Sequence, residues 1–297
     1  MRVFDNISEL LHFSGLDAPS HPLIAVVDYS NIDFSYFDEE KICLNFYKIS
    51  FRDTFMGKVP YGQGYYDFKE GGLAFLKPRQ IVTAPHTSER QEGYALYFHQ
   101  DFISGYPLGQ AINQYGFFSY NVSEALLLSA AEKNIIASLF TGIMKELNHA
   151  IDGFTQDIVV SQVEQLLHYS KRFYNRQFIT RKTVNNEIIA ALDALLYSYF
   201  HEGKPLIQGL PSVSYVSEEL KLSQRYLSDM LRTLTGLTTQ QYIQDKVIEQ
   251  AKNLLSTTTL TVAEIAYQMG FEHPQSFSKL FKVKTTLAPL AYRQTFN

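Results

Sequence analysis

Short runs of β-branched and aromatic residues dominate the chain between residues 20 and 120. The runs PLIAVVDYS, KICLNFYKISF, GGLAFLKPRQIV and EGYALYFHQ are separated by segments rich in Gly, Pro and charged residues, which are typical of turns. No helical pattern interrupts these runs, and that arrangement favours an antiparallel sandwich or barrel. We therefore predict an antiparallel sandwich or barrel for the N-terminal region, residues 1–120.

After residue 120 the apolar positions change to helical spacing. They recur every three or four residues over three segments, with stripes at Leu128, Ile135, Leu139, Ile143 and Leu147, at Val159, Val163, Leu166 and Phe173, and at Ile188, Leu192, Leu195 and Tyr199. These stripes can pack against the preceding sheet or form a two-fold dimer interface. Residues 121–205 are therefore predicted to be a helical connector with dimerisation potential, ending in a Gly- and Pro-containing linker over residues 201–211.

Short helices are predicted from Ser212 onward. One apolar stripe runs over residues 213–222, and a second follows Ser223 and stops at Gly236, a residue that commonly ends helices. Two short helices joined over residues 221–223 are typical of a helix-turn-helix unit.

The same arrangement then repeats. Thr261 and Glu264 form a capping-box signal, Gly270 supplies the turn, and a second helix follows Pro274. Superposing the two units pairs Ser217 with Ala266, Leu220 with Met269, Leu222 with Phe271 and Leu227 with Phe277. Between them a single helix of about 17 residues, about 25 Å long, can hold two groove-reading helices about one DNA turn apart.

The C-terminal segments VSEELKLSQRYLSDMLRTLTGLTTQQYIQDKVIEQAKNLL and AEIAYQMGF-x4-SFSKLFK, followed by P-x2-YR, closely resemble the AraC/XylS family of transcription regulators. The resemblance covers about 85 residues, and the N-terminal zone is similar to the cupin-type sensor barrel of many members. It implies an α+β protein with a cupin-like antiparallel β-barrel, a helical connector, and an all-α domain with two helix-turn-helix units over residues 206–297. It also implies dimerisation through the N-terminal region.

Two positions depart from the pattern of that family. Ser217 stands where alanine is usual, and its hydroxyl can bond to a carbonyl one turn earlier. Thr285 and Thr286 stand where Phe-Gly is common, which leaves the conformation of that turn open.

Residues that face outward on the two recognition helices are the candidate DNA contacts. On the first helix Leu227, Leu231 and Leu234 face inward, which leaves Gln224, Arg225, Ser228, Asp229 and Arg232 outward. Gln and Arg side chains read adenine and guanine edges through paired hydrogen bonds. The alternative is a solvated helix face on which Arg225 and Asp229 form an ordinary ion pair one turn apart.

On the second helix the outward residues are predicted to be His273, Gln275, Ser276, Ser278, Lys279 and Lys282. We assign Lys279 and Lys282 to phosphates, and His273 and Gln275 to base edges. Glu272 can accept a hydrogen bond from a cytosine amine or cap the helix. We expect Arg293 to pair with a carboxylate rather than with DNA.

Charge and composition agree with this division of the chain. The net charge is −4, but the residues from Leu210 onward carry nine Lys/Arg against seven Asp/Glu, whereas the first 209 residues sum to −6. A relatively basic C-terminal region suits a polyanionic partner. The single cysteine, Cys43, excludes an intramolecular disulfide and a cysteine-rich zinc site. The N-terminal MRVFDNISEL lacks the apolar run of a signal peptide, and no run is long enough to span a membrane, so we expect a cytoplasmic protein with no membrane partner.

The main rival class is a cupin-type small-molecule-binding protein or metal-dependent enzyme with an accessory helical domain. The eight His residues include no His-x-His or helical pair, and only His86 and His99 could meet across strands. No G-x-S-x-G, P-loop or G-x-G-x-x-G motif is present, and a cysteine-dependent methyl acceptor would need more than Cys43.

We therefore expect a non-enzymatic, effector-responsive DNA-binding regulator without a cofactor or metal. Its expected partners are a double-stranded operator, a second copy of the chain and RNA polymerase, together with a small-molecule effector. The residues that could line an effector pocket are Tyr47, Tyr65, Tyr66, Phe68, Phe75 and Arg79.

Overall fold

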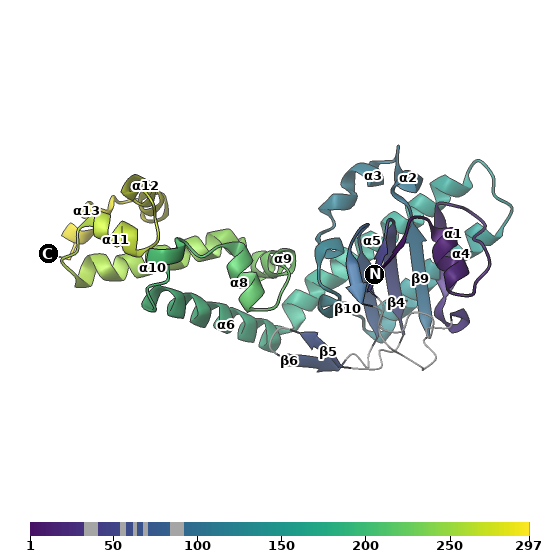
Figure 1. The fold of residues 1–297 in the computed structure, drawn as a ribbon, viewed down its shortest axis with the longest axis horizontal. Helices are drawn as coiled ribbons and strands as arrows, with labels where there is room; N and C mark the ends of the chain where they lie inside the picture. The colour runs from purple at the N-terminus through teal and green to yellow at the C-terminus, as the bar shows by residue number, and fades with distance from the viewer. Residues whose placement is uncertain (33–40, 54–57, 62–63, 68–70, 84–91, 297) are drawn as a thin grey trace. The chain divides into compact units, whose positions relative to one another are not determined.

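The computed structural model describes residues 1–32, 41–53, 58–61, 64–67, 71–83 and 92–296 (Figure 1). The chain divides into two compact units, Met1–Thr180 and Arg181–Asn297. Sheets and two long helices make up the first unit, and short helices around one longer helix make up the second. The mixed α+β class with a helical C-terminal part is confirmed.

The described strands of the first unit form three sheets. The five-stranded sheet has the order β10 (Leu126–Leu127), β7 (Gly72–Leu76), β4 (Tyr47–Arg52), β9 (Gly93–Phe98), β2 (Ile24–Asp28), with all pairs antiparallel. The three-stranded sheet has the order β1 (Arg2–Phe4), β3 (Lys41–Leu44), β8 (Ile81–Thr83), with β1 and β3 parallel; β5 (Lys58–Tyr61) and β6 (Gly64–Asp67) form an antiparallel hairpin. Since the described strands do not pair into one continuous ring, the predicted closed barrel is not confirmed.

Both faces of the five-stranded sheet are covered. On one face Phe51 of β4 and Tyr94 of β9 stack on Phe140 of helix α4 (Ala130–Asn148), with ring centroids 6.0 and 5.9 Å apart. The other face contributes Tyr97 and its neighbours to a core shared with β1, β3 and α1 (Ile7–Phe13). Alternate residues of each central strand therefore serve two separate apolar layers, which explains the near-continuous apolar runs in the sequence.

The residues predicted to line an effector pocket have different environments. Tyr47 stacks on Phe98, and Phe75 packs against Phe117, so both are buried in the core. Arg79 is exposed and has a φ of 65°. The side chains of Tyr65 and Tyr66, and all of Phe68, lie outside the described residues. Tyr47 and Phe75 thus pack in the core, a role that alternation along the strands could not separate from pocket lining.

The first two predicted connector helices are α4 and α5 (Thr155–Thr180), which pack on each other. In α5 every residue of the predicted stripe is buried. In α4 Ile143 and Leu147 are buried as expected, but Ile136 and Phe140 complete the buried face in place of Ile135 and Leu139. The buried positions therefore differ by one residue from the predicted stripe in the first half of α4 only, where Phe140 packs in the aromatic cluster on the sheet. Two short helices, α2 (Gln100–Ile103) and α3 (Pro107–Ala111), precede them.

The second unit is entirely helical among its described residues. Its helices are α6 (Lys182–His201), α7 (Pro205–Gln208), α8 (Val213–Glu219), α9 (Gln224–Thr235), α10 (Thr239–Thr257), α11 (Val262–Gln268), α12 (Pro274–Thr285) and α13 (Pro289–Gln294).

The third predicted connector helix, α6, is part of this unit. Tyr199 donates a hydrogen bond to the carbonyl of Gly209 at 3.0 Å, and its ring packs on Tyr215 of α8. The predicted linker over residues 201–211 contains α7, and Gly209 lies against the backbone of Gly270. The division into a sensor over 1–120, a connector over 121–205 and a DNA-binding domain over 206–297 remains a prediction.

Candidate nucleic-acid interface

The first helix-turn-helix unit consists of α8 and α9. Ser212 and Ser223 begin the two helices, each accepting a hydrogen bond from the backbone N–H three residues later, as N-cap serines do. The turn between the helices is made by Lys221, whose φ of 56° lies in the left-handed region. The N–H of Leu222 then donates to the carbonyl of Ser217 at 2.9 Å, which closes the turn.

The second unit, α11 and α12, repeats this geometry. Gly270 occupies the left-handed turn position with a φ of 87°, and the N–H of Phe271 donates to the carbonyl of Ala266 at 3.0 Å. This bond matches the one between Leu222 and Ser217, as the superposition of the two sequences predicts. Thr261 and Glu264 form the predicted capping box, and the hydrogen bonds from Thr261 to the Glu264 carboxylate hold its pKa below the usual range.

Helix α10 connects the two units. It begins with a capping box between Thr238 and Gln241 and extends over 19 residues, two more than predicted. It packs against α9, α11, α12 and α13. The prediction that Arg293 pairs with a carboxylate is wrong. Arg293 instead donates hydrogen bonds to the backbone carbonyls of Leu255 at 3.1 Å and Leu260 at 2.6 Å. Leu255 lies in the last turn of α10, where carbonyls lack helical partners and a cation is favourable.

Both departures from the family pattern have a local structural answer. The Ser217 hydroxyl donates to the carbonyl of Ser214 at 2.9 Å, so its hydrogen bond is satisfied inside α8 as expected. Thr286 ends α12 with a φ of 68°, and its backbone N–H donates a hydrogen bond to the carbonyl of Lys282 at 2.9 Å. Gly236 ends α9 in the same way, so a β-branched residue occupies a position that suits glycine.

The first recognition helix, α9, buries Tyr226, Leu227, Met230 and Leu231 and leaves the candidate contacts outside. Gln224, Arg225 and Arg232 are exposed and Ser228 is half-buried. Arg225 Nε donates to Asp229 Oδ2 at 3.0 Å, and the Gln224 amide donates to the Ser214 hydroxyl at 3.2 Å. The polar side chains at the start of this face are thus held by neighbours within the unit.

The second recognition helix, α12, buries Phe277 and Phe281. The exposed candidates on its other side are His273, Gln275, Ser276, Lys279 and Lys282. His273, rather than Glu272, is the N-cap residue, and its side chain makes no capping hydrogen bond. Lys284, also in the last turn, is paired with Asp245 of α10 at 2.6 Å. The exposed face of α12 therefore carries two lysines without an acidic residue between them.

The comparisons with known proteins agree with this geometry. Residues 216–295 match the family model described as a helix-turn-helix domain. The HTH-type transcriptional activator RhaR of Enterobacter sp. strain 638 is 32% identical over 133 residues, which are 43% of each chain. Histidine kinase P4 of Formosa agariphila is 32% identical over 81 residues, 27% of this chain and 6% of the kinase.

Among solved structures, the C-terminal domain of the response regulator yesN from Fusobacterium nucleatum is 38% identical, with a TM-score of 0.29. The match covers 34% of this chain and 95% of that domain. For the two relatives named above, the matched region spans less than half the length of RhaR and a small fraction of the kinase. The C-terminal domain of this chain belongs to the AraC/XylS family.

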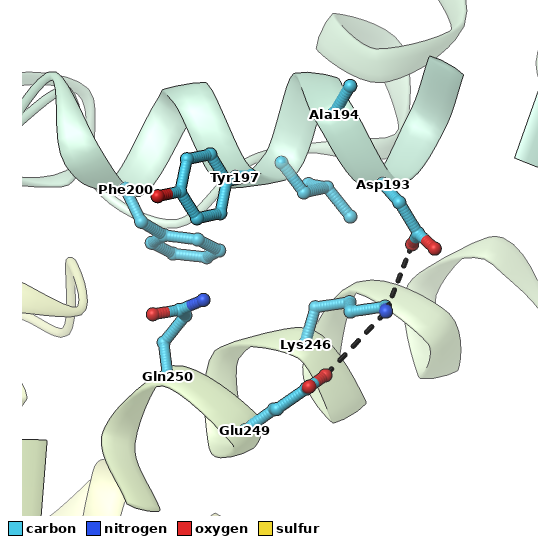
Figure 2. Close-up of a pocket in the computed structure, with 8 residues that line it drawn as sticks. Asp193, Ala194, Tyr197, Phe200, Lys246, Glu249 and Gln250 are labelled. Atoms are coloured by element: carbon cyan, nitrogen blue, oxygen red, sulfur yellow. Dashed lines mark ion pairs between the residues drawn. The ribbon is translucent and has the colours of Figure 1, made fainter. Parts of the chain in front are cut away.

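The AraC-type domain carries an additional helix, α6, whose attachment the sequence did not predict. Asp193 of α6 accepts a hydrogen bond from the Tyr242 hydroxyl at 2.8 Å. Asp193 also pairs with Lys246 at 3.1 Å (Figure 2). Burial and the bond to Asp193 raise the pKa of the Tyr242 phenol far above its usual range. Burial alone would lower the pKa of Lys246, but Asp193 and Glu249 raise it.

A groove lies between α6 and α10. Its lining residues include Asp193, Lys246, Glu249, Tyr197, Phe200 and Gln250 (Figure 2). No pattern in the sequence identifies Asp193 as the partner of residues about fifty positions later, because the contact depends on the packing of two helices.

Of the two histidines considered for the rival enzyme class, only His99 lies in the described part of the chain. His99 is the N-cap residue of α2, and its Nδ1 lies 3.2 Å from Asp101 Oδ2, while His86 lies outside the described residues. Among the residues that the structure describes, no three His, Cys, Asp or Glu side chains are grouped so as to hold a metal. None of the described helices combines the length and hydropathy needed to cross a bilayer.

Proposed function

We propose that this chain is a sequence-specific DNA-binding transcription regulator that reads two successive major-groove segments per protomer. One observation carries the proposal: two helix-turn-helix units with the same turn hydrogen bond flank α10, and each leaves a polar face of its second helix exposed. Second helices of such units enter the major groove.

The two exposed faces have different chemistry. The face of α9 presents Gln224, Arg225 and Arg232, which suit base edges. The face of α12 presents Lys279 and Lys282, which suit phosphates, with His273 and Gln275 near the start of the helix, where base edges are closest. We infer that the first unit contributes mainly specificity and the second mainly affinity.

The N-terminal unit is proposed to be a cupin-like sensor and to mediate homodimerisation. Its antiparallel five-stranded sheet supports the resemblance to cupin-type sensor domains, on which the small-molecule-binding role rests. An effector would act by favouring one placement of the DNA-binding domains, which changes operator occupancy or recruitment of RNA polymerase. The protein would act in the cytoplasm and without a metal or catalytic step.

The test is selection of duplex DNA by the full-length chain from a randomised pool, followed by affinity measurements over a salt series. We expect an enriched site, tighter binding to it than to random duplex, and a linear fall of log affinity with log salt. The proposal fails if the chain enriches no sequence and binds selected and random duplexes equally at every salt concentration.

A further inference from the structure

A carboxylate lies on the very face of α9 that is proposed to meet DNA. Asp229 accepts a hydrogen bond from Arg225 Nε at 3.0 Å, and the two side chains are one helical turn apart. Arg225 is 47% exposed and Asp229 is 23% exposed. Exposed ion pairs at this spacing add little to the stability of a helix, so the effect of Asp229 on the direction of Arg225 is the more consequential one.

The hydrogen bond leaves a defined part of Arg225 available. A guanidinium carries five N–H donors, and Asp229 takes the one on Nε, which leaves the two terminal nitrogens at the far end of the side chain. Across the part of the chain that the structure describes, no other hydrogen bond of Arg225 is found. Two terminal nitrogens in one plane match the O6 and N7 acceptors of guanine.

Arg225 is also in the right part of the helix for base contact. It is the second residue of α9, and the first turn of a recognition helix is the part that reaches base edges. Gln224 is held by Ser214 of α8, so it competes less for the same position. A long Arg side chain that is already oriented loses less conformational entropy when it binds a base.

We propose that Arg225 and Asp229 read one G·C base pair together: Asp229 fixes the guanidinium, and Arg225 donates both terminal amino groups to the guanine. Asp229 is a positioning residue, and it sets specificity at that base pair. The inference rests on the proposed function, since it assigns a base preference to the first helix-turn-helix unit.

The proposal predicts effects of opposite sign for one substitution. A carboxylate near DNA repels phosphates, so Asp229→Ala should bind random duplex as tightly as the parent or about two- to threefold more tightly. At the same time it should lose discrimination at one G·C pair. A residue with only a structural role would weaken binding to all duplexes in parallel.

The experiment uses the full-length chain and the site that it selects. Affinities are measured for that site, for a random duplex, and for duplexes in which each G·C pair is replaced in turn by A·T. For the parent, one replacement should cost about tenfold or more. Asp229→Ala should reduce that factor about three- to tenfold, and Arg225→Lys, which keeps the charge but not the planar fork, should reduce it at the same position.

Glu219→Gln is the matched control, because Glu219 is an exposed acid on α8 of the same unit, outside the recognition helix, and removal of its charge should tighten binding to selected and random duplexes alike. Thermal unfolding verifies that every variant is folded. The inference is overturned if Asp229→Ala keeps full discrimination at every position, or if the variants at Arg225 and Asp229 affect different positions. If the parent selects no site at all, the proposed function fails as well; if it selects one that these variants read unchanged, only the inference fails.

Discussion

Single residues at helix ends explain much of the local structure of the AraC-type domain. Ser212, Ser223, Thr238 and Thr261 each satisfy backbone N–H groups that would otherwise lack partners. These caps depend only on residues three positions apart, so the sequence was sufficient to locate them. The left-handed positions are less regular, since lysine, glycine and threonine all occur there.

Thr286 offers a test of this left-handed geometry. We expect Thr286→Gly to raise the free energy of unfolding by about 1 kcal/mol, because glycine adopts a φ of 68° without the cost that a β-branched residue pays. Urea denaturation measures the change.

The control is the converse substitution at the equivalent end of α9. Gly236 has a φ of 78° and open space where a Cβ would be placed, so Gly236→Ala should cost about 1 kcal/mol through backbone strain alone. A Thr286→Gly variant that is less stable than the parent would show that the Thr286 hydroxyl outweighs the strain.

Lys279 tests the assignment of α12 to phosphates. Lys279→Ala should weaken binding to selected and random duplexes by similar factors and reduce the slope of log affinity against log salt by about one. Titrations at several salt concentrations measure both quantities.

Arg225→Ala should instead weaken binding to the selected site by about 1–3 kcal/mol and relax the base preference at one position of that site. Equal behaviour of the two variants would contradict the division between affinity and specificity.

At the scale of elements, α6 is held to α10 by polar contacts as well as by packing. Asp193 is the common partner of Tyr242 and Lys246. A single acidic side chain therefore links one helix to two residues in the first two turns of the helix that connects the helix-turn-helix units.

We expect Asp193→Ala to lower the free energy of unfolding by about 1 kcal/mol, since it leaves the half-buried Tyr242 hydroxyl and Lys246 ammonium without this partner. Chemical denaturation of the full chain, followed by a probe in the C-terminal domain, measures the effect. Glu249→Gln serves as control, because Glu249 is 64% exposed and 3.6 Å from Lys246, and it should change the stability by less than about 0.5 kcal/mol. Equal losses of stability in the two variants would contradict the prediction that Asp193 holds α6 to α10.

At the scale of the whole molecule, the chain divides at residues 180 and 181. Tyr199 and Leu196 are almost fully buried, and Tyr199 contacts Gly209 and Tyr215 in the same unit. The helix predicted as the end of a connector is therefore attached to the AraC-type domain.

This attachment predicts different behaviour for two fragments. Residues 181–297 should unfold in one cooperative transition, whereas residues 206–297 should be less stable by several kcal/mol, because each large apolar side chain removed from the core contributes about 1.5–3 kcal/mol. Circular dichroism during heating distinguishes them. Fragments with the same midpoint would show that α6 adds nothing to the stability of the domain.

The sequence alone determined the features that depend on near neighbours along the chain. It located the caps, both helix-turn-helix units and the long helix between them, and it separated the apolar and polar sides of α9 and α12, since each of these is fixed by spacing within about a dozen residues. Tertiary structure alone decided contacts between distant segments: the core positions of Tyr47 and Phe75, the buried face of α4, the carbonyl partners of Arg293, and the attachment of α6 through Asp193. Periodicity states which side of an element is apolar, but the element that covers that side is chosen by packing and by the pairing of polar groups across the fold.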